Sequence, residues 1–131
     1  MANPNLLAAT TASGTTAYLT PGGTSALVLI RNAASSGQVY KINQIVAANV
    51  SGSAAVNATV SIYTNGGVAP GSAPSGGTGY PVASTISVPA NASLIVADKT
   101  TAIYLMEDQS ITVTSGTGSG ITYTVSYEII S

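Results

Sequence analysis

The 131-residue chain contains no cysteine, no histidine, no tryptophan and no phenylalanine. Without cysteine it can form neither a disulfide framework nor a thiolate zinc site, and the redox state of its compartment stays open. Without histidine it lacks the side chain on which acid–base catalysis most often depends, so Ser-His and Cys-His arrangements are excluded. We therefore expect no enzymatic activity and no cofactor.

Charged side chains are also scarce, at 5% of the residues, whereas ordinary globular domains carry about a quarter. They are Arg31, Lys41, Asp98, Lys99, Glu107, Asp108 and Glu128. A net charge of −1 offers no field that could hold phosphates, so we expect no nucleic-acid partner. The same scarcity leaves little repulsion between copies of the chain, which favours association.

Long hydrophobic runs are missing as well, although 45% of the residues are hydrophobic. No stretch approaches the roughly 18 uninterrupted apolar residues of a membrane-spanning helix. The first residues lack the basic and apolar regions of a secretory signal. We expect neither secretion nor a membrane partner.

What the sequence does contain is a period-2 alternation of apolar and hydroxyl-bearing residues, which is typical of strands packed on one face. In the last such run Ile121, Tyr123 and Val125 share one face. A change of phase inside another run predicts a β-bulge near Asn43–Gln44. The predicted strands are 15–20, 25–32, 38–50, 55–64, 82–88, 92–98, 102–106, 110–115 and 121–130.

Eight or nine short strands with regular turns predict an all-β fold, an antiparallel two-sheet β-sandwich that is either jelly-roll or Ig-like. We expect one domain over residues 15–131, preceded by an extended N-terminal arm at residues 1–14. Residues 65–81, rich in Gly, Pro and Ser, predict a long loop that is mobile or held by a partner.

The tyrosines divide by the face of the strand on which they lie. Tyr123 and Tyr127 have the apolar parity of their strand, which predicts core packing. Other tyrosines lie on a polar parity or border the arm and the long loop, and two leucines lie in the arm itself. These residues form our candidate interface: Leu6, Leu7, Tyr18, Tyr63 and Tyr80.

Two neighbouring acids, Glu107 and Asp108, interrupt the strand pattern. We interpret them as exposed residues of a hairpin turn. The alternatives are a weak calcium site completed by loop carbonyls and, less favoured, a catalytic carboxylate pair. We predict no metal ligands elsewhere.

A β-sandwich exposes strand edges, which solitary proteins usually protect with lysine or inward-pointing charge. With three basic residues in the chain, that protection is largely missing. Either prolines, bulges and loops shield every edge, or other subunits cover the edges. We favour the second, although Pro81 and Pro89 could each blunt an edge locally.

Several segments resemble small virion structural proteins of tailed bacteriophages over residues 42–128. They are Val88–Leu94 around a Val-Pro-Ala turn, Ile103–Leu105, Glu107–Ile111 and Val125–Glu128. These motifs form turns and strands and carry no catalytic signature. Gln109 departs from the pattern, which has Gly there, so the type of this hairpin turn is open.

The resemblance implies a β-sandwich in the phage particle, made in the host cytoplasm. We expect a capsid decoration (cement) protein whose partners are the major capsid protein or another virion protein, together with copies of itself. The arm at residues 1–14 could lie across a neighbour. The alternatives are a neck, tail, baseplate or fibre component, or a carbohydrate- or receptor-binding module.

Overall fold

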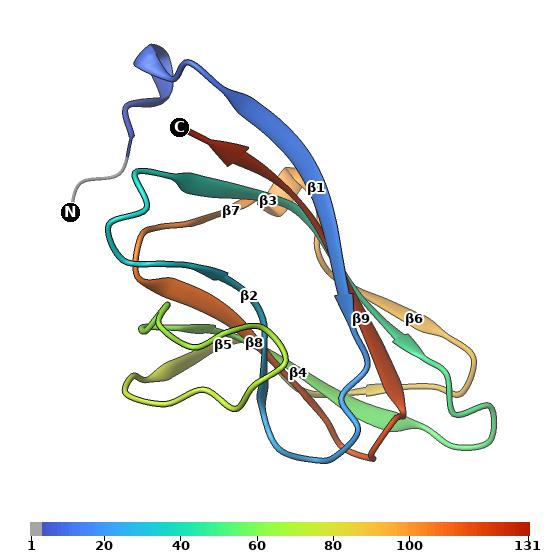
Figure 1. The fold of residues 1–131 in the computed structure, drawn as a ribbon. Coiled ribbons are helices and arrows are strands. Elements are labelled where there is room, and N and C mark those ends of the chain that lie inside the picture. Colours follow the sequence, from blue (N-terminus) through green and yellow to red (C-terminus); the bar gives the residue numbers. More distant parts are fainter. Residues whose placement is uncertain (1–3) are drawn as a thin grey trace.

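The computed structural model describes residues 4–131 as two antiparallel sheets packed face to face, which confirms the predicted β-sandwich (Figure 1). Two single-turn 3-10 helices, η1 (Leu6–Ala8) and η2 (Lys99–Thr101), interrupt the strands. The strands are β1 (Ala12–Leu19), β2 (Leu27–Asn32), β3 (Val39–Asn49), β4 (Val56–Tyr63), β5 (Gly79–Val88), β6 (Ser93–Ala97), β7 (Ile103–Leu105), β8 (Gln109–Ser115) and β9 (Ile121–Ile130).

The order of the strands decides between the two sandwich topologies. Sheet A has the order β1-β9-β3-β6, with the short β7 also paired to β3, and sheet B has the order β2-β8-β4-β5. Strands β1 and β9, β2 and β8, β3 and β6, and β4 and β5 therefore pair, as in a long hairpin wound around itself. This is the jelly-roll arrangement of two four-stranded sheets, with β7 as a short addition.

The core lies between the inner faces of the two sheets. Sheet A contributes Ile42, Ile45 and Val125, and sheet B contributes Val60 and Val113, all of them buried. Each such side chain contributes about 1.5–3 kcal/mol relative to leaving it exposed. The register of β3 against β9 shifts between Ile42 and Gln44, which confirms the predicted bulge. The extra residue lets Ile42 and Ile45, an odd number of positions apart, face the same core.

Tyr123 ties the two sheets together. Its ring comes from β9 of sheet A and is fully buried, as its parity predicted. Its hydroxyl donates to the carbonyl of Thr114 on β8 and accepts a hydrogen bond from the backbone N–H of Thr59 on β4, 3.2 Å away. Tyr127 is half-buried against the core and stacks on Tyr40, with ring centroids 5.2 Å apart.

The long loop before β5 forms hydrogen bonds with the rest of the chain, and its mobility or capture by a partner stays a prediction. Ser72 and Gly71 exchange backbone hydrogen bonds of 2.9 and 2.8 Å with Val28 on β2. The hydroxyl of Tyr63 accepts from the N–H of Gly77, and Asn65 donates to the Ser75 carbonyl. The loop is also shorter than predicted, because β5 already begins at Gly79.

Two other segments differ from the sequence-based boundaries. β1 begins at Ala12, inside the predicted arm, whose residues 1–3 lie outside the described part of the chain. The first residues of β1 are exposed on both faces and therefore show no alternation. In the β7–β8 hairpin Asp108 is exposed and takes the left-handed conformation with φ of 59°, so the missing glycine at Gln109 is not needed. Glu107 is half-buried there.

Replacing Tyr123 with Phe keeps the ring in the core but removes both hydrogen bonds of its hydroxyl. We expect the free energy of unfolding at pH 7 to fall by about 1–3 kcal/mol, since buried backbone groups lose a partner. Urea denaturation measures the change. Tyr80→Phe is the matched control, because Tyr80 is exposed and the change should stay within about 0.5 kcal/mol.

The stability difference between wild type and Y123F should also depend on pH in the alkaline range. Burial raises the pKa of Tyr123 to about 12 from the ordinary value of 10.0. A raised folded-state pKa stabilises the native state fully below the unfolded pKa, and this contribution is lost as the pH rises through the folded pKa. The stability difference between wild type and Y123F should therefore shrink between pH 10 and 12. A difference that stays constant over this window would contradict the bridging role.

Replacing Gly66 with Ala should dislodge the start of the long loop. A Cβ at this position would stand 2.3 Å from the carbonyl oxygen of Asn32 at the end of β2, a backbone atom that cannot move aside easily. Overpacking of this kind costs about 1–3 kcal/mol. We expect that loss in urea denaturation and faster proteolytic cleavage within residues 64–78. Gly22→Ala, with no heavy atom within 4 Å of its Cβ, is the control that should change neither.

Candidate functional site

Each sheet of the sandwich has two edges, and the edge at β2 is shielded by the chain. Val28 on β2 exchanges backbone hydrogen bonds with Gly71 and Ser72 of the long loop. The guanidinium of Arg31 extends the contact by donating to the Gly67 carbonyl at 3.0 Å. The long loop therefore covers the backbone groups with which a strand of another protein would pair at this edge.

The other edge of sheet B, β5, is irregular. Pro81 lies within the strand and has no N–H to offer a neighbour. The register of β5 against β4 shifts twice along its length, and Thr85 takes a positive φ of 46°. Proline and bulges are devices that protect an edge from pairing.

The edge of sheet A beyond β3 is divided into two short strands, β6 and β7. Between them lies η2, whose N-cap is Asp98 and whose first residue is Lys99. The carboxylate of Asp98 accepts from the N–H and the hydroxyl of Thr100, and these bonds lower the pKa of Asp98. A charged turn between two short strands leaves no continuous ladder for a partner.

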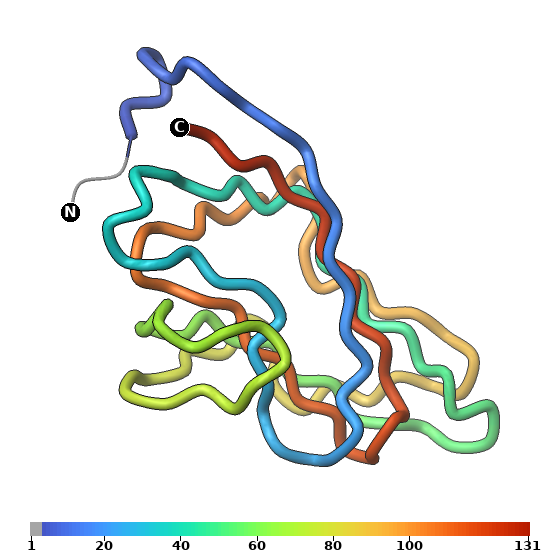
Figure 2. The backbone as a smooth tube through the Cα atoms, in the orientation of Figure 1, coloured from blue at the N-terminus to red at the C-terminus, as the bar shows by residue number. Residues whose placement is uncertain are grey.

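The fourth edge, β1, has none of these devices. Its eight residues contain no proline and no charged side chain, and its register with β9 runs from Ala12 to Leu19 without a shift. Thr11 and Ser131 exchange both backbone hydrogen bonds just before the strand, where the segment that leads into β1 runs beside the C-terminal end of the chain (Figure 2). Hydrogen bonding alternates along an antiparallel pair. The N–H and C=O groups that point away from β9 are therefore those of Ala12, Gly14, Thr16 and Tyr18.

The outer face of sheet A, next to this edge, is rich in hydroxyl groups. Thr16 on β1 and Ser126 on β9 are hydrogen bonded at 3.2 Å, and Thr20 and Thr122 at 2.8 Å. Tyr18 stands at the edge of this face with 78% of its side chain exposed. These polar hydroxyls help to keep this face compatible with water.

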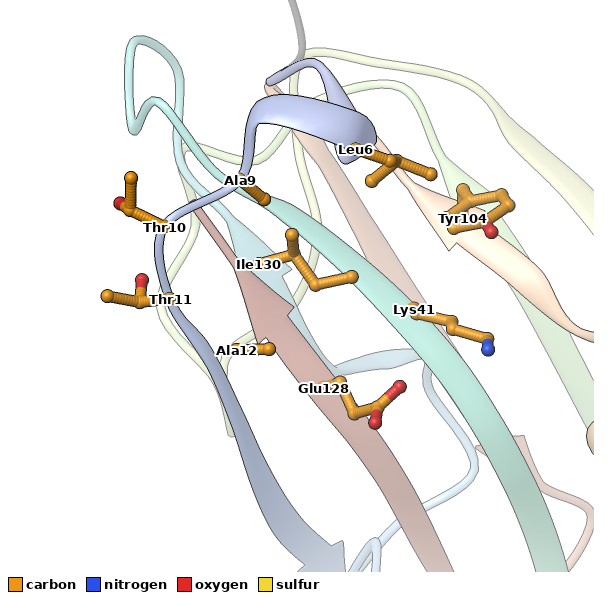
Figure 3. Close-up of a pocket in the computed structure, with 9 residues that line it drawn as sticks. All are labelled: Leu6, Ala9, Thr10, Thr11, Ala12, Lys41, Tyr104, Glu128 and Ile130. Carbon is orange, nitrogen blue, oxygen red and sulfur yellow. The ribbon is translucent and has the colours of Figure 1, made fainter.

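A hollow of about 490 Å³ lies at one end of the outer face, under the N-terminal segment (Figure 3). Its base is a row across three strands, β9, β3 and β7, because the register places Glu128 opposite Lys41 and Lys41 opposite Tyr104. Leu6 of η1 and the last strand's Ile130 add apolar walls. Within residues 4–131 the Lys41 ammonium and the Glu128 carboxylate form no ion pair, although the two residues lie opposite each other.

The sequence did not point to this row. Lys41, Tyr104 and Glu128 come from β3, β7 and β9, and only the strand register brings them together. No spacing along the chain could have shown it.

The predicted interface residues lie in several places. Leu6 lines the hollow and is 47% exposed, whereas Leu7 points away and is 99% exposed. Tyr18 lies on the open β1 edge, and Tyr80 is exposed on β5 of the other sheet. Tyr63 holds the long loop through its hydroxyl. The structure thus brings only Leu6 and Tyr18 to the outer face of sheet A, and a role in binding stays a prediction for all five.

Among residues 4–131, no three His, Cys, Asp or Glu side chains lie close enough to share a metal ion. The Oδ1 atom of Asp108 accepts from the N–H of Gly66 at 3.0 Å and so anchors the long loop. The described elements include no helix of the length and apolarity that crossing a bilayer requires.

Comparisons of the chain with protein-family models, with curated proteins and with solved structures found no match.

Proposed function

We propose that this chain is a non-enzymatic structural protein of a tailed bacteriophage particle, a capsid decoration protein that binds the shell and stabilises it. The observation that carries its role in an assembly is the open β1 edge. The chain shields its other three sheet edges but leaves this one straight, uncharged and free of proline. An edge of this kind invites pairing with another chain, and proteins that act alone avoid it.

The virion assignment itself has two supports. The turn and strand motifs of residues 42–128 resemble those of small phage structural proteins. The jelly-roll order of the strands recurs in viral capsid proteins and in lectins, and this analogy of fold is the second support. A neck, tail, baseplate or fibre component is the alternative place in the particle.

Purified protein should bind expanded capsids that lack decoration and slow their thermal disruption. Co-sedimentation measures the binding, and capsids that already carry their full complement are the control that should take up none. Binding to isolated tails in place of capsids would move the protein to the tail or neck. Binding to neither structure would contradict the virion proposal.

A second candidate function, carbohydrate binding, is favoured by the hollow on sheet A. Its base offers a carboxylate, an ammonium group and a phenol in one row, beside apolar Leu6 and Ile130. Sugars are bound by such mixtures, because their hydroxyls need hydrogen-bonding groups and their C–H faces pack on aromatic rings. The hydroxyl-rich surface around the hollow suits a polar ligand.

A glycan array with the purified protein tests this candidate. If the hollow binds a sugar, Tyr104→Ala and Glu128→Gln should each weaken the best signal at least about tenfold, the equivalent of one lost hydrogen bond or packing contact. Tyr80→Ala, which alters an exposed tyrosine of the other sheet, should leave it unchanged. An array without signal removes the candidate.

A further inference from the structure

We propose that β1 pairs with β1 of a second copy of this chain, antiparallel and about a two-fold axis at Thr15, so that sheet A runs on from one copy into the next. The inference rests on the proposed structural function, since it names the partner of the same open edge. The inference also goes beyond the proposed function, because it assigns the partner, the two-fold axis and the strand register.

The register follows from the backbone groups that β1 leaves unpaired. Those groups belong to Ala12, Gly14, Thr16 and Tyr18, because hydrogen bonding with β9 uses the residues between them. With the axis at Thr15, Ala12 lies opposite Tyr18 of the second copy and Gly14 opposite Thr16. Every outward-pointing residue of the strand then meets an outward-pointing residue. An axis at Gly14 or Thr16 would leave one of them without a partner from the other strand.

The side chains agree with this register. On the outer face the large Tyr18 would lie beside the small Ala12 of the other copy, and Thr16 beside Gly14, which has no side chain at all. Large-to-small neighbours pack across a strand pair without collision. Tyr18, 78% exposed in the single chain, would gain a neighbour. A Cβ at Gly14 meets no heavy atom within 4 Å, so there is room above it.

The lack of charge on β1 favours a second copy over an unrelated strand. In a two-fold pair the residue on the axis faces its own counterpart and its neighbours lie close to theirs, so a charged residue there would lie near a like charge. A strand that pairs with a different protein could carry charge and meet its complement. All eight residues of β1 are uncharged, which is what self-pairing requires.

The protected state of the other edges sets the size of the assembly. A strand pair with two-fold symmetry uses the same patch on both copies and closes on itself. Because β2 is covered by the long loop, β5 is kinked and β6 and β7 are divided, no second strand edge is left to extend the pair into a fibre. The pair is therefore a closed dimer.

Charge placed on the axis provides the first test. Thr15 is exposed, and Thr15→Lys or Thr15→Glu would each set two like charges directly opposite one another. Analytical ultracentrifugation of the wild type, up to about 1 mM because a single strand pair buries little surface, should show a dimer. Each variant alone should be monomeric, and an equimolar mixture of the two should restore the dimer. A monomeric wild type, or variants that dimerise like the wild type, would overturn the pairing.

Disulfide trapping tests the register, and the chain has no cysteine of its own to interfere. Residues on the axis of a non-hydrogen-bonded pair have Cα atoms about 4.5 Å apart, within reach of a disulfide. Thr15→Cys should therefore give a covalent dimer under mild oxidation. Thr16→Cys, one residue away, should not, because it faces Gly14. Trapping through position 16 in place of 15 would overturn the proposed axis.

Failure of this inference is distinguishable from failure of the proposed function. A chain that binds capsids yet stays monomeric in both tests would refute the β1 pair and leave the virion proposal intact. A chain that dimerises through Thr15 but binds neither capsids nor tails would refute the virion proposal and leave the β1 pair intact.

Discussion

Backbone N–H and C=O groups at the margin of a sheet must be covered, or they bind another strand. This constraint explains why the chain looks as it does. The long Gly/Pro/Ser loop lies along β2, Pro81 and two register shifts break β5, and η2 divides the remaining margin of sheet A. These three solutions use few charged residues, Lys99 of η2 among them, which is how a sandwich with so few charges remains a defined fold. Within residues 4–131 β1 alone keeps an unshielded edge, and its neutrality fits the partner that we propose, a second copy of the chain.

The interior depends both on apolar packing and on the hydrogen bonds of one buried tyrosine. Apolar residues of both sheets fill the core, but the backbone of β4 and β8 also receives the hydroxyl of Tyr123 from the opposite sheet. A bridge of this kind fixes how one sheet lies over the other, which packing of Val and Ile alone does loosely. The row of Glu128, Lys41 and Tyr104 lies on the outer face of sheet A, where the register of β9, β3 and β7 aligns it.

The sequence predicted the sandwich and its strands well because alternation and turn residues are local signals. It located the bulge at Asn43–Gln44, since a change of parity has no other simple cause. It missed the start of β1, whose residues are exposed on both faces. It did not show the contacts between the long loop and β2, because β2 lies about 40 residues upstream in the chain. The row on sheet A depends on the register of three strands, which no local pattern encodes. The open edge could be suspected from composition but not assigned to a strand.

Amide hydrogen exchange of β1, followed by NMR at increasing protein concentration, tests the central claim most directly. The account predicts that the N–H groups of Ala12, Gly14, Thr16 and Tyr18 exchange quickly in dilute solution and become protected as the concentration rises. The N–H groups of Ser13, Thr15 and Ala17, already bonded to β9, should stay protected throughout. Outward-facing amides whose exchange does not change with concentration would contradict the account.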